Sequence, residues 1–152
     1  MTSMEQVDVP LGSLLPVEQV RFPVELKTRP GFQPDDPRTW PKIDGRLEYV
    51  GGRLLYRPPY GDVQGTIAVT LATLLGEWAE RHPEFVPRAN EAGMRLSGET
   101  RAADAAVWLR SEVPFTGGLA RTPPILAGEI AGEDAEEPVL LSKAQWYLDH
   151  WG

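Results

Sequence analysis

The chain of 152 residues contains no cysteine and only two histidines, His82 and His150. Without cysteine it can form no disulfide, iron–sulfur cluster, cysteine zinc site or cysteine nucleophile. Two histidines are too few for a histidine-rich metal site. Because the absence of cysteine fits a reducing compartment, we expect a cytoplasmic protein.

Long apolar runs are also absent. No stretch approaches the length needed to cross a membrane, and the N-terminus shows no basic segment followed by an apolar one. We therefore expect no membrane partner. Repeats, glycine-rich phosphate loops and low-complexity tracts are absent too. With 41% hydrophobic residues, the chain is long enough for one compact domain with its own core.

Basic residues are fewer than acidic ones. The chain has 15 lysines and arginines and 22 acidic residues, so its net charge is −7. The acidic excess lies in residues 61–80 and 122–152, whereas residues 81–121 contain six arginines. Nucleic-acid-binding proteins normally show a basic face, so the overall balance argues against a large nucleic-acid footprint. Clustered arginines could still form a small one.

Residues 1–42 are rich in proline and show little periodicity, so we interpret them as an N-terminal arm in front of a single domain, residues 43–152. Residues 20–26 predict a short edge strand, because Pro23 is excluded from a central one. Residues 30–41 predict loop. The arm is either a lid or partner-binding segment or an extended segment packed along the surface, and the second interpretation is the simpler one.

The domain opens with a hairpin signal, two β-prone runs at residues 46–50 and 53–56 around Gly51-Gly52. From Asp62 to His82 the hydrophobic period becomes helical, and Pro83 ends the run. Apolar residues spaced three and four apart predict a core-facing stripe on this helix: Val63, Ile67, Leu71, Leu74, Leu75 and Trp78.

Shorter β-prone runs follow at residues 85–88, 94–96, 104–109 and 124–131. Between the first two, Asn90-Glu-Ala-Gly93 predicts a turn with Gly93 at positive φ, and Ser97-Gly98 predicts another. Loops are expected at residues 111–123 and in the acidic segment 133–137. Ser142 and Gln145 fit a capping box that opens a last helix carrying Trp146, Tyr147 and Trp151. This order predicts an α/β or α+β sheet with helices on its faces.

Two acids, Asp104 and Glu129, each lie in an apolar strand with small alanines on the same face. A carboxylate among apolar neighbours is costly unless it is paired or bound to a cation. Two such carboxylates that converge would form a hard oxygen site suited to Mg²⁺. Lys143, close behind, would orient or deprotonate an attacking water and offset charge on a phosphate.

Passive roles remain open for two of these residues. Asp104 follows Arg101 and could pair with it or cap a turn. Lys143 could be an ordinary exposed lysine in the first turn of a helix, where it slightly opposes the helix dipole. Glu129 is harder to explain passively, because its apolar neighbours predict a buried strand.

Taken together, these segments resemble the Uma2 family, a bacterial group of endonucleases in the PD-(D/E)xK nuclease superfamily. The resemblance covers roughly residues 40–152 and rests on four segments, the hairpin at residues 46–54, the Asp104 strand at 101–107, the Glu129 strand at 125–130, and Lys143 followed by Tyr147. It implies a restriction-endonuclease-like mixed β-sheet flanked by helices. It also implies hydrolysis of phosphodiester bonds in nucleic acid with Mg²⁺, or Mn²⁺ in its place.

Carried over by position, the family's active-site acids correspond to Asp104 and Glu129, which the resemblance makes the metal ligands. Its lysine corresponds to Lys143, which substitutes for the lysine that the classical motif has at Ala131. Glu48 in the hairpin would complete the site. Gln64 stands where the family has a histidine, which removes a candidate ligand or base.

Glu91 is a further candidate, because it precedes a β-prone run beside the Asp104 strand. The predicted turn at residues 90–93 explains the same residue without any chemistry, and both interpretations stay open.

The family usually continues beyond Gly152 into a final strand and hairpin. We therefore expect either a truncated chain or a sheet edge covered by another subunit or by the N-terminal arm. Two other functions follow as alternatives to the endonuclease. One is a catalytically inactive nuclease-fold module for binding or assembly, and the other is a homodimer formed through the open sheet edge.

Overall fold

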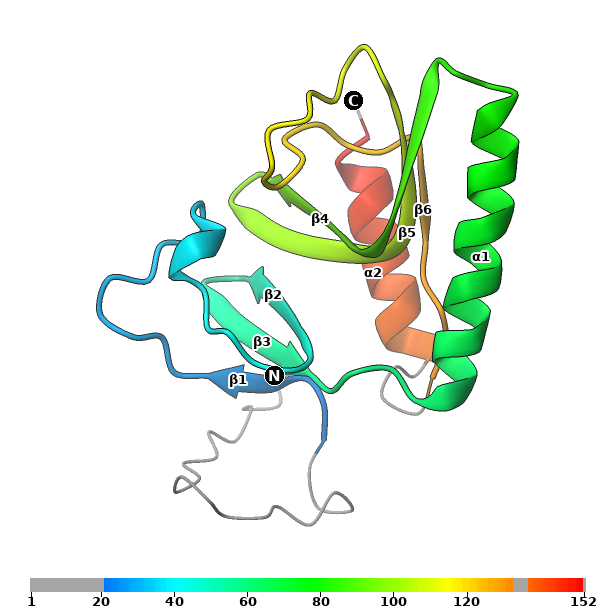
Figure 1. The fold of residues 1–152 in the computed structure, drawn as a ribbon. Coiled ribbons are helices and arrows are strands. Elements are labelled where there is room, and N and C mark those ends of the chain that lie inside the picture. The colour runs from blue at the N-terminus through cyan, green and yellow to red at the C-terminus, as the bar shows by residue number, and fades with distance from the viewer. Residues whose placement is uncertain (1–20, 133–136, 152) are drawn as a thin grey trace.

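The computed structural model describes residues 21–132 and 137–151 (Figure 1). Within them the chain forms six strands and two α-helices: β1 (Val24–Leu26), β2 (Arg46–Val50), β3 (Arg53–Arg57), α1 (Asp62–Glu80), β4 (Phe85–Leu96), β5 (Glu99–Leu109), β6 (Leu126–Gly128) and α2 (Glu137–Asp149), with a 3₁₀ helix, η2, at Pro37–Thr39. The strands make one sheet in the order β1-β3-β2-β5-β4, and β6 also pairs with β5. The α+β fold is therefore as predicted.

All pairings between these named strands are antiparallel. A parallel contact occurs at the isolated bridge between Met94 and Ala120. Strand β5 pairs with three other strands. β4 pairs along one side of β5, and β2 and β6 pair with different parts of its other side. Residues 102–108 of β5 are all buried. β5 is therefore the strand around which the rest of the fold packs.

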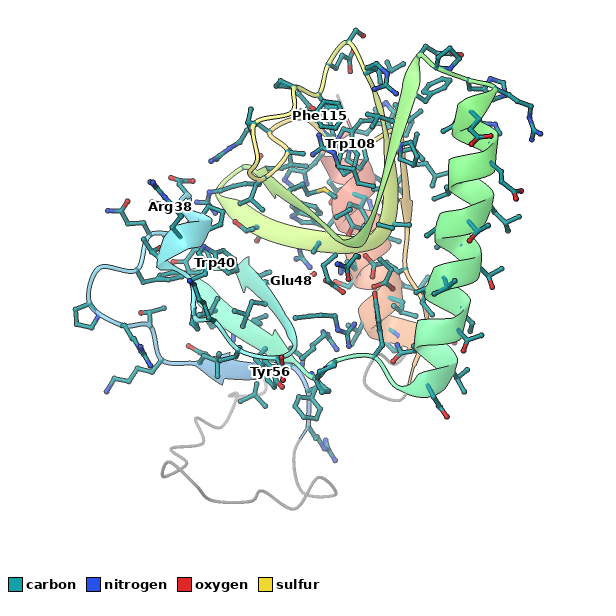
Figure 2. The ribbon with its side chains drawn as sticks, viewed as in Figure 1. Arg38, Trp40, Glu48, Tyr56, Trp108 and Phe115 are labelled. Atoms are coloured by element: carbon teal, nitrogen blue, oxygen red, sulfur yellow. The ribbon has the colours of Figure 1, made fainter. Side chains whose placement is uncertain are left out.

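Trp108 is the largest fully buried side chain and lies inside the curved β4–β5 pair (Figure 2). Its indole Nε1 donates a hydrogen bond of 2.8 Å to the carbonyl of Thr122, which satisfies the polar atom that burial would otherwise leave unpaired. Trp146 of α2 joins the same core cluster. In Figure 1, β6 and the adjoining part of β5 pass between α1 and α2.

The predicted helix at residues 62–82 is confirmed as α1, but its predicted core stripe is only partly correct. Leu71, Leu75 and Trp78 are half-buried, whereas Val63, Ile67 and Leu74 are 67%, 45% and 59% exposed. Within α1 only Gln64 is buried. The face of α1 that packs against the rest of the protein therefore includes Gln64. The face predicted from the apolar residues is rotated away from it.

Both predicted tight turns are confirmed. Gly51 and Gly52 join β2 to β3 with φ values of 59° and 78°, the two positive values that a type I′ turn requires. Ser97 and Gly98, also at positive φ, join β4 to β5.

The predicted turn at residues 90–93 is wrong, because the two β-prone runs around it form the single strand β4. The register against β5 shifts between Ala89 and Ala92, which marks a β-bulge. Asn90 and Glu91 have φ values of 57° and 61°. Gly93 does not have the positive φ that the turn required. A Cβ on it would lie 2.7 Å from Leu119, so close packing explains the glycine.

The C-terminal predictions need three corrections. Strand β6 covers only Leu126–Gly128 of the predicted residues 124–131. Helix α2 begins at Glu137, so Ser142 lies inside it and the capping box is wrong. Lys143 therefore lies beyond the first helical turn. Helix α2 ends at Asp149, so Trp151, which was predicted to lie on it, follows its end. Pro138, in the first turn of α2, occupies a position that proline favours. The predicted acidic loop, apart from Glu137, falls outside the described residues.

The described part of the N-terminal arm, residues 21–42, lies along the sheet. β1 pairs with β3 at the sheet edge, as predicted, but it covers only Val24–Leu26 of the predicted residues 20–26. The Phe32 ring contacts Trp40 at 5.8 Å and Tyr49 of β2 at 5.6 Å between ring centroids. Asp35 forms ion pairs with Arg95 and Arg121. Val20 and the rest of the arm fall outside the described residues.

Over residues 21–132 and 137–151, neither α1 nor α2 is both long and apolar enough to cross a membrane.

Candidate active site

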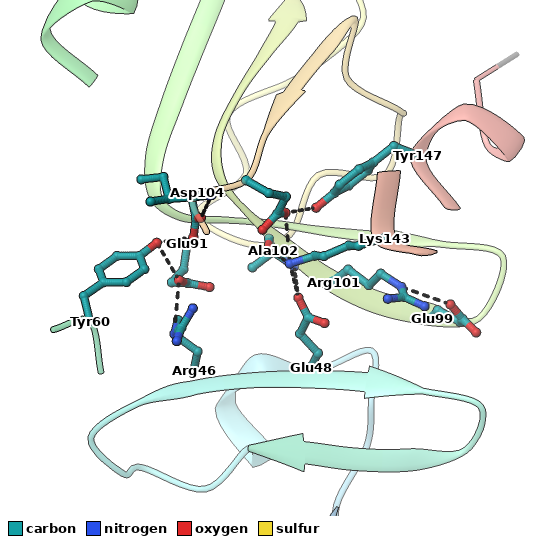
Figure 3. Close-up of polar contacts among 12 residues, drawn as sticks. Arg46, Glu48, Tyr60, Glu91, Glu99, Arg101, Ala102, Asp104, Lys143 and Tyr147 are labelled. Carbon is teal, nitrogen blue, oxygen red and sulfur yellow. Dashed lines mark hydrogen bonds and ion pairs between the residues drawn. The ribbon is translucent and has the colours of Figure 1, made fainter. Parts of the chain in front are cut away.

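A cleft of about 370 Å³ lies between the β2–β3 hairpin, the β4–β5 pair and the first part of α2. Four of the residues proposed from the sequence line it, Glu48, Glu91, Asp104 and Lys143. The structure thus brings together side chains from β2, β4, β5 and α2 that are up to 95 positions apart in the sequence. Figure 3 shows these residues in one group.

Lys143 is the centre of this group. Its Nζ lies 2.7 Å from Glu48 Oε1 and 2.9 Å from Glu129 Oε1, and it donates a third bond of 2.7 Å to the carbonyl of Ala102 (Figure 3). Burial alone would lower the pKa of Lys143, but the charges of Glu48 and Glu129 outweigh it and raise the pKa. The ammonium group is therefore charged and has all three protons bonded.

Glu129 is held from two sides. The hydroxyl of Tyr147 donates 2.7 Å to the same Oε1 that Lys143 contacts. Lys143 and Tyr147 are four residues apart on α2 and so face the same way. Burial raises the pKa of Glu129; Lys143 opposes that rise, and the charge of Asp104 adds to it.

Glu48 and Lys143 also bind the backbone of β5. The Ala102 amide donates 3.2 Å to Glu48 Oε1, and the Ala102 carbonyl accepts from Lys143. On this edge of β5, β2 pairs at Thr100 and β6 pairs only from Ala105 onward. Between these two pairings, no strand in the described part of the chain bonds to Ala102 on this side of β5. The side chains of Glu48 and Lys143 instead bond to its amide and carbonyl groups.

Asp104 is 5% exposed and accepts two hydrogen bonds. Oδ1 accepts from the Tyr60 hydroxyl, and Oδ2 accepts from the Ile130 amide at 2.5 Å. The passive interpretation of Asp104 as a partner of Arg101 is wrong, because the Arg101 guanidinium pairs with Glu99 at 3.3 Å. Asp104 instead ties β5 to the segment after β6.

The β4 bulge brings Glu91 to the same place. Its Oε1 lies 3.1 Å from the Tyr60 hydroxyl, which therefore stands between the carboxylates of Glu91 and Asp104 and has one proton for both (Figure 3). Arg46 forms an ion pair with Glu91, with its Nε 3.9 Å from Oε1. Burial, and next the charge of Asp104, raise the pKa of Glu91 to about 7. Negative charge is in excess here.

Gln64 does not line the cleft. It is buried in the first turn of α1, where its Nε2 donates 3.4 Å to the Ile130 carbonyl. A Cβ at position 132 would collide with the Gln64 amide, so the close packing requires Gly132. Gln64 thus supports the segment that follows Glu129, and the amide of that same Ile130 binds Asp104.

Sequence patterns missed Tyr60 and Arg46 as parts of the site. Tyr60 lies between Pro59 and the start of α1, where neither helical nor strand periodicity applies. The Arg46 guanidinium lies 4.8 Å over the Tyr60 ring and binds the Pro58 carbonyl at 3.1 Å. Only its place in the hairpin, two residues before Glu48, could have suggested a role.

A divalent cation such as Mg²⁺ needs hard oxygen donors. No three His, Cys, Asp or Glu residues in the described part of the chain are grouped so as to hold a metal. Mg²⁺, however, keeps several waters and often uses only one or two carboxylates. The donors here are carboxylate oxygens with excess negative charge at Asp104 and Glu91. Their chemistry fits a hard cation held by few protein ligands.

Comparison with known proteins identifies one family and one fold. The family model described as "Uma2: Putative restriction endonuclease" matches residues 34–151. A crystal structure described as a "putative nuclease belonging to DUF820" from Anabaena variabilis is similar, with a TM-score of 0.64 and 15% sequence identity over 74% of this chain. At that identity the likeness concerns the fold alone. The chain spans 65% of that protein's length. No curated protein matches the sequence.

Proposed function

This chain belongs to the Uma2 family, and on that premise we propose that it is a Mg²⁺-dependent endonuclease that hydrolyses phosphodiester bonds in nucleic acid, with Mn²⁺ as a substitute cation. The observation that supports this most is that Glu48, Glu91, Asp104 and Lys143 line one cleft, and that Glu129, which lines the neighbouring groove between β6 and α2, is bound to Lys143. Action in a bacterial cytoplasm belongs to the same proposal.

Asp104 and Glu129 are the residues we propose as metal ligands, with Glu91 beside Asp104. The cation would supply an activated water at neutral pH and neutralise charge on the phosphate. The Ile130 amide and the Tyr147 hydroxyl keep the two carboxylates in position. Glu91 adds negative charge that a cation would offset.

Lys143 is proposed to assist the attacking water or the scissile phosphate through its positive charge, since its three protons are bonded to Glu48, Glu129 and the Ala102 carbonyl. Because its pKa is raised, it would stabilise developing negative charge and not accept a proton. Glu48 positions the ammonium group through its 2.7 Å ion pair. The rigid support from Glu48 and Ala102 fixes the charge before the substrate arrives, so little reorganisation is needed.

A cleavage assay tests the proposal. Labelled single- and double-stranded DNA and RNA are incubated with and without Mg²⁺ or Mn²⁺, and Asp104→Asn is compared with the wild type. The control is Asp44→Asn, an exposed aspartate outside the cleft. Divalent-dependent cleavage that is lost only in Asp104→Asn is the expected result. Calorimetry that shows no divalent binding in the millimolar range would refute the metal part.

A catalytically inactive module for binding or assembly is the alternative. It is favoured by Gln64, which replaces the family's histidine and is bound to Ile130 outside the cleft. Nucleic acid that is bound but never cleaved, with either cation, would support this alternative. Cleavage abolished by Asp104→Asn would end it.

Homodimer formation remains a proposal. A groove of about 500 Å³ between β6 and α2 is lined by Leu126, Leu141, Leu148 and Trp151, each at least 48% exposed. Apolar grooves of this kind are candidate interfaces. Analytical ultracentrifugation at high concentration decides the matter, since a monomer there excludes the dimer.

A further inference from the structure

We propose that the cleft-facing side of the β2–β3 hairpin binds the sugar–phosphate backbone of the substrate through Arg46, Arg53 and Arg57, with Arg101 across the cleft. The inference rests on the proposed function, since it concerns the same cleft. It goes further in that it names the protein surface and the part of the substrate that meet there.

The strand register places these arginines together. Arg46 pairs with Arg57, Glu48 with Leu55, and Val50 with Arg53. Paired residues of antiparallel strands share a face, as do alternate residues of one strand. One face of the hairpin therefore carries Arg46, Arg53 and Arg57 around Glu48 and Leu55. All five residues line the cleft, which confirms that this face is its wall.

The charge of the cleft is opposite to that of the chain. Five basic side chains and three acidic ones line it, although the net charge of the chain is −7. A cleft with an excess of one sign focuses the potential and raises the local concentration of oppositely charged ligands. A polyanion is thus attracted to this cleft and repelled by the acidic remainder of the protein.

Arg46 and Arg101 are held in place by their neighbours. The Arg46 guanidinium lies over the Tyr60 ring, and the Arg101 guanidinium lies 4.9 Å over the Trp146 ring. Their side chains are 12% and 15% exposed. Pre-positioned guanidinium groups lose less conformational entropy on binding, and their planar fork matches a phosphate.

The depth of the acids supports the same arrangement. Asp104 is 5% exposed, whereas Arg53 on the hairpin is exposed. A phosphate chain that enters the cleft therefore meets arginines on the hairpin before one phosphate reaches the carboxylates. Contacts to phosphates carry no sequence information, so the predicted binding is independent of base sequence and strongly salt-dependent.

The test measures binding without catalysis. Fluorescence anisotropy of a labelled oligonucleotide, single- or double-stranded, is recorded in EDTA at several salt concentrations. The variant Arg53→Gln/Arg57→Gln is compared with Arg29→Gln/Arg81→Gln, which has the same change in net charge at exposed positions outside the cleft. Arg53→Lys/Arg57→Lys tests rescue by charge.

We expect the hairpin variant to bind roughly tenfold more weakly and its slope of log affinity against log salt to fall by about 2. The control should change affinity by less than about twofold, and the lysine variant should keep most of the slope. Equal weakening in hairpin and control variants, or an unchanged slope, would overturn the inference. Urea unfolding curves verify that each variant folds. If the double variant does not, the exposed Arg53→Gln alone is compared with Arg81→Gln.

Failure of the two proposals can be told apart. A wild type that binds nucleic acid through the hairpin but cleaves none refutes the endonuclease and supports this inference. A wild type that cleaves, with hairpin variants that bind as well as the control, refutes the inference alone. A wild type that binds no nucleic acid refutes both.

Discussion

The two ends of the candidate site neutralise their charge in different ways. At one end, Lys143 bonds directly to Glu48 and Glu129, so two carboxylates face a full positive charge. At the other end, Asp104 and Glu91 share the neutral hydroxyl of Tyr60. Lys143 thus contacts both carboxylates of the first end directly, whereas at the second end the Arg46 guanidinium lies 3.9 Å from Glu91.

This difference indicates which end is complete in the protein alone. The Lys143 end is an ion-pair network with every ammonium proton bonded. At the Asp104 end burial, and next the charge of Asp104, raise the pKa of Glu91. We therefore expect the first end to depend on its internal partners and the second to respond to an added cation.

The largest effect on catalysis is expected from Asp104→Asn. Loss of its charge removes a proposed metal ligand, so divalent-dependent cleavage should fall by at least about 100-fold. Stability should change much less, because the asparagine side chain keeps an oxygen for the Ile130 amide. Cleavage rates and urea unfolding are measured side by side. A variant as active as Asp44→Asn would remove Asp104 from the mechanism.

The next effect concerns stability at the Lys143 end. Lys143→Met leaves Glu48 and Glu129 buried without their cation and should lower the free energy of unfolding by about 3 to 5 kcal/mol. The double variant Glu48→Gln/Lys143→Met should recover part of this loss. Denaturant unfolding at pH 7 measures both. A small loss in the single variant would show that the carboxylates there need no internal cation.

A pH effect is expected from Glu91 at the Asp104 end. The pKa of Glu91 rises from 4.5 in the unfolded chain to about 7 in the fold, so the folded state binds more protons between these values. Stability should therefore fall as pH rises from about 4.5 to 7, by roughly 2 to 3 kcal/mol. Asp104, Arg46, Lys143 and Tyr60 are the groups that act on Glu91.

Unfolding curves in EDTA measure this slope in the wild type and in Glu91→Gln, which should lose the Glu91 part of it and keep the part that the raised pKa of Glu129 contributes. Added Mg²⁺ should flatten the wild-type slope as well, because a cation offsets the same charge. An identical slope in wild type and Glu91→Gln would contradict the assignment.

The smallest effects come from the two tyrosines. Tyr60→Phe removes the hydroxyl between Asp104 and Glu91 and should cost about 1 to 3 kcal/mol of stability. Tyr147→Phe should cost about 1 kcal/mol or less, since Lys143 still pairs with Glu129. Thermal unfolding of the two variants gives a direct comparison. A larger loss of stability in Tyr147→Phe than in Tyr60→Phe would contradict the expectation that the Asp104 end depends more on its tyrosine hydroxyl.

Local chemistry made some elements predictable. Gly51-Gly52 and Ser97-Gly98 define their hairpins because positive φ is needed there and few residues supply it. The ends of α1 follow from local signals too. The convergence of Glu48, Glu129 and Lys143 was a different case, because periodicity says nothing about contacts between distant segments. The strand acids and the lysine close behind them suggested a site with Glu129 and Lys143, and only the family resemblance added Glu48 to it.

The β-bulge in β4 and the start of α2 could not be predicted from local sequence. Asn90 and Glu91 both take positive φ in the bulge, although neither is glycine, because pairing on both sides fixes the strand. The four residues from Ser142 to Gln145 matched a capping motif, yet the helix had already begun at Glu137. In each case the tertiary environment overrode a local preference that was physically sound.

The Ala102 backbone amide can report on the state of Glu48. Its amide proton is bound by the Glu48 carboxylate instead of a neighbouring strand. Hydrogen exchange at this single amide therefore reports on Glu48, and it should quicken when Glu48 is replaced or turns away to a substrate or cation. A backbone signal in the middle of the sheet thus becomes a probe of events in the cleft, readable by NMR without a label on any site residue.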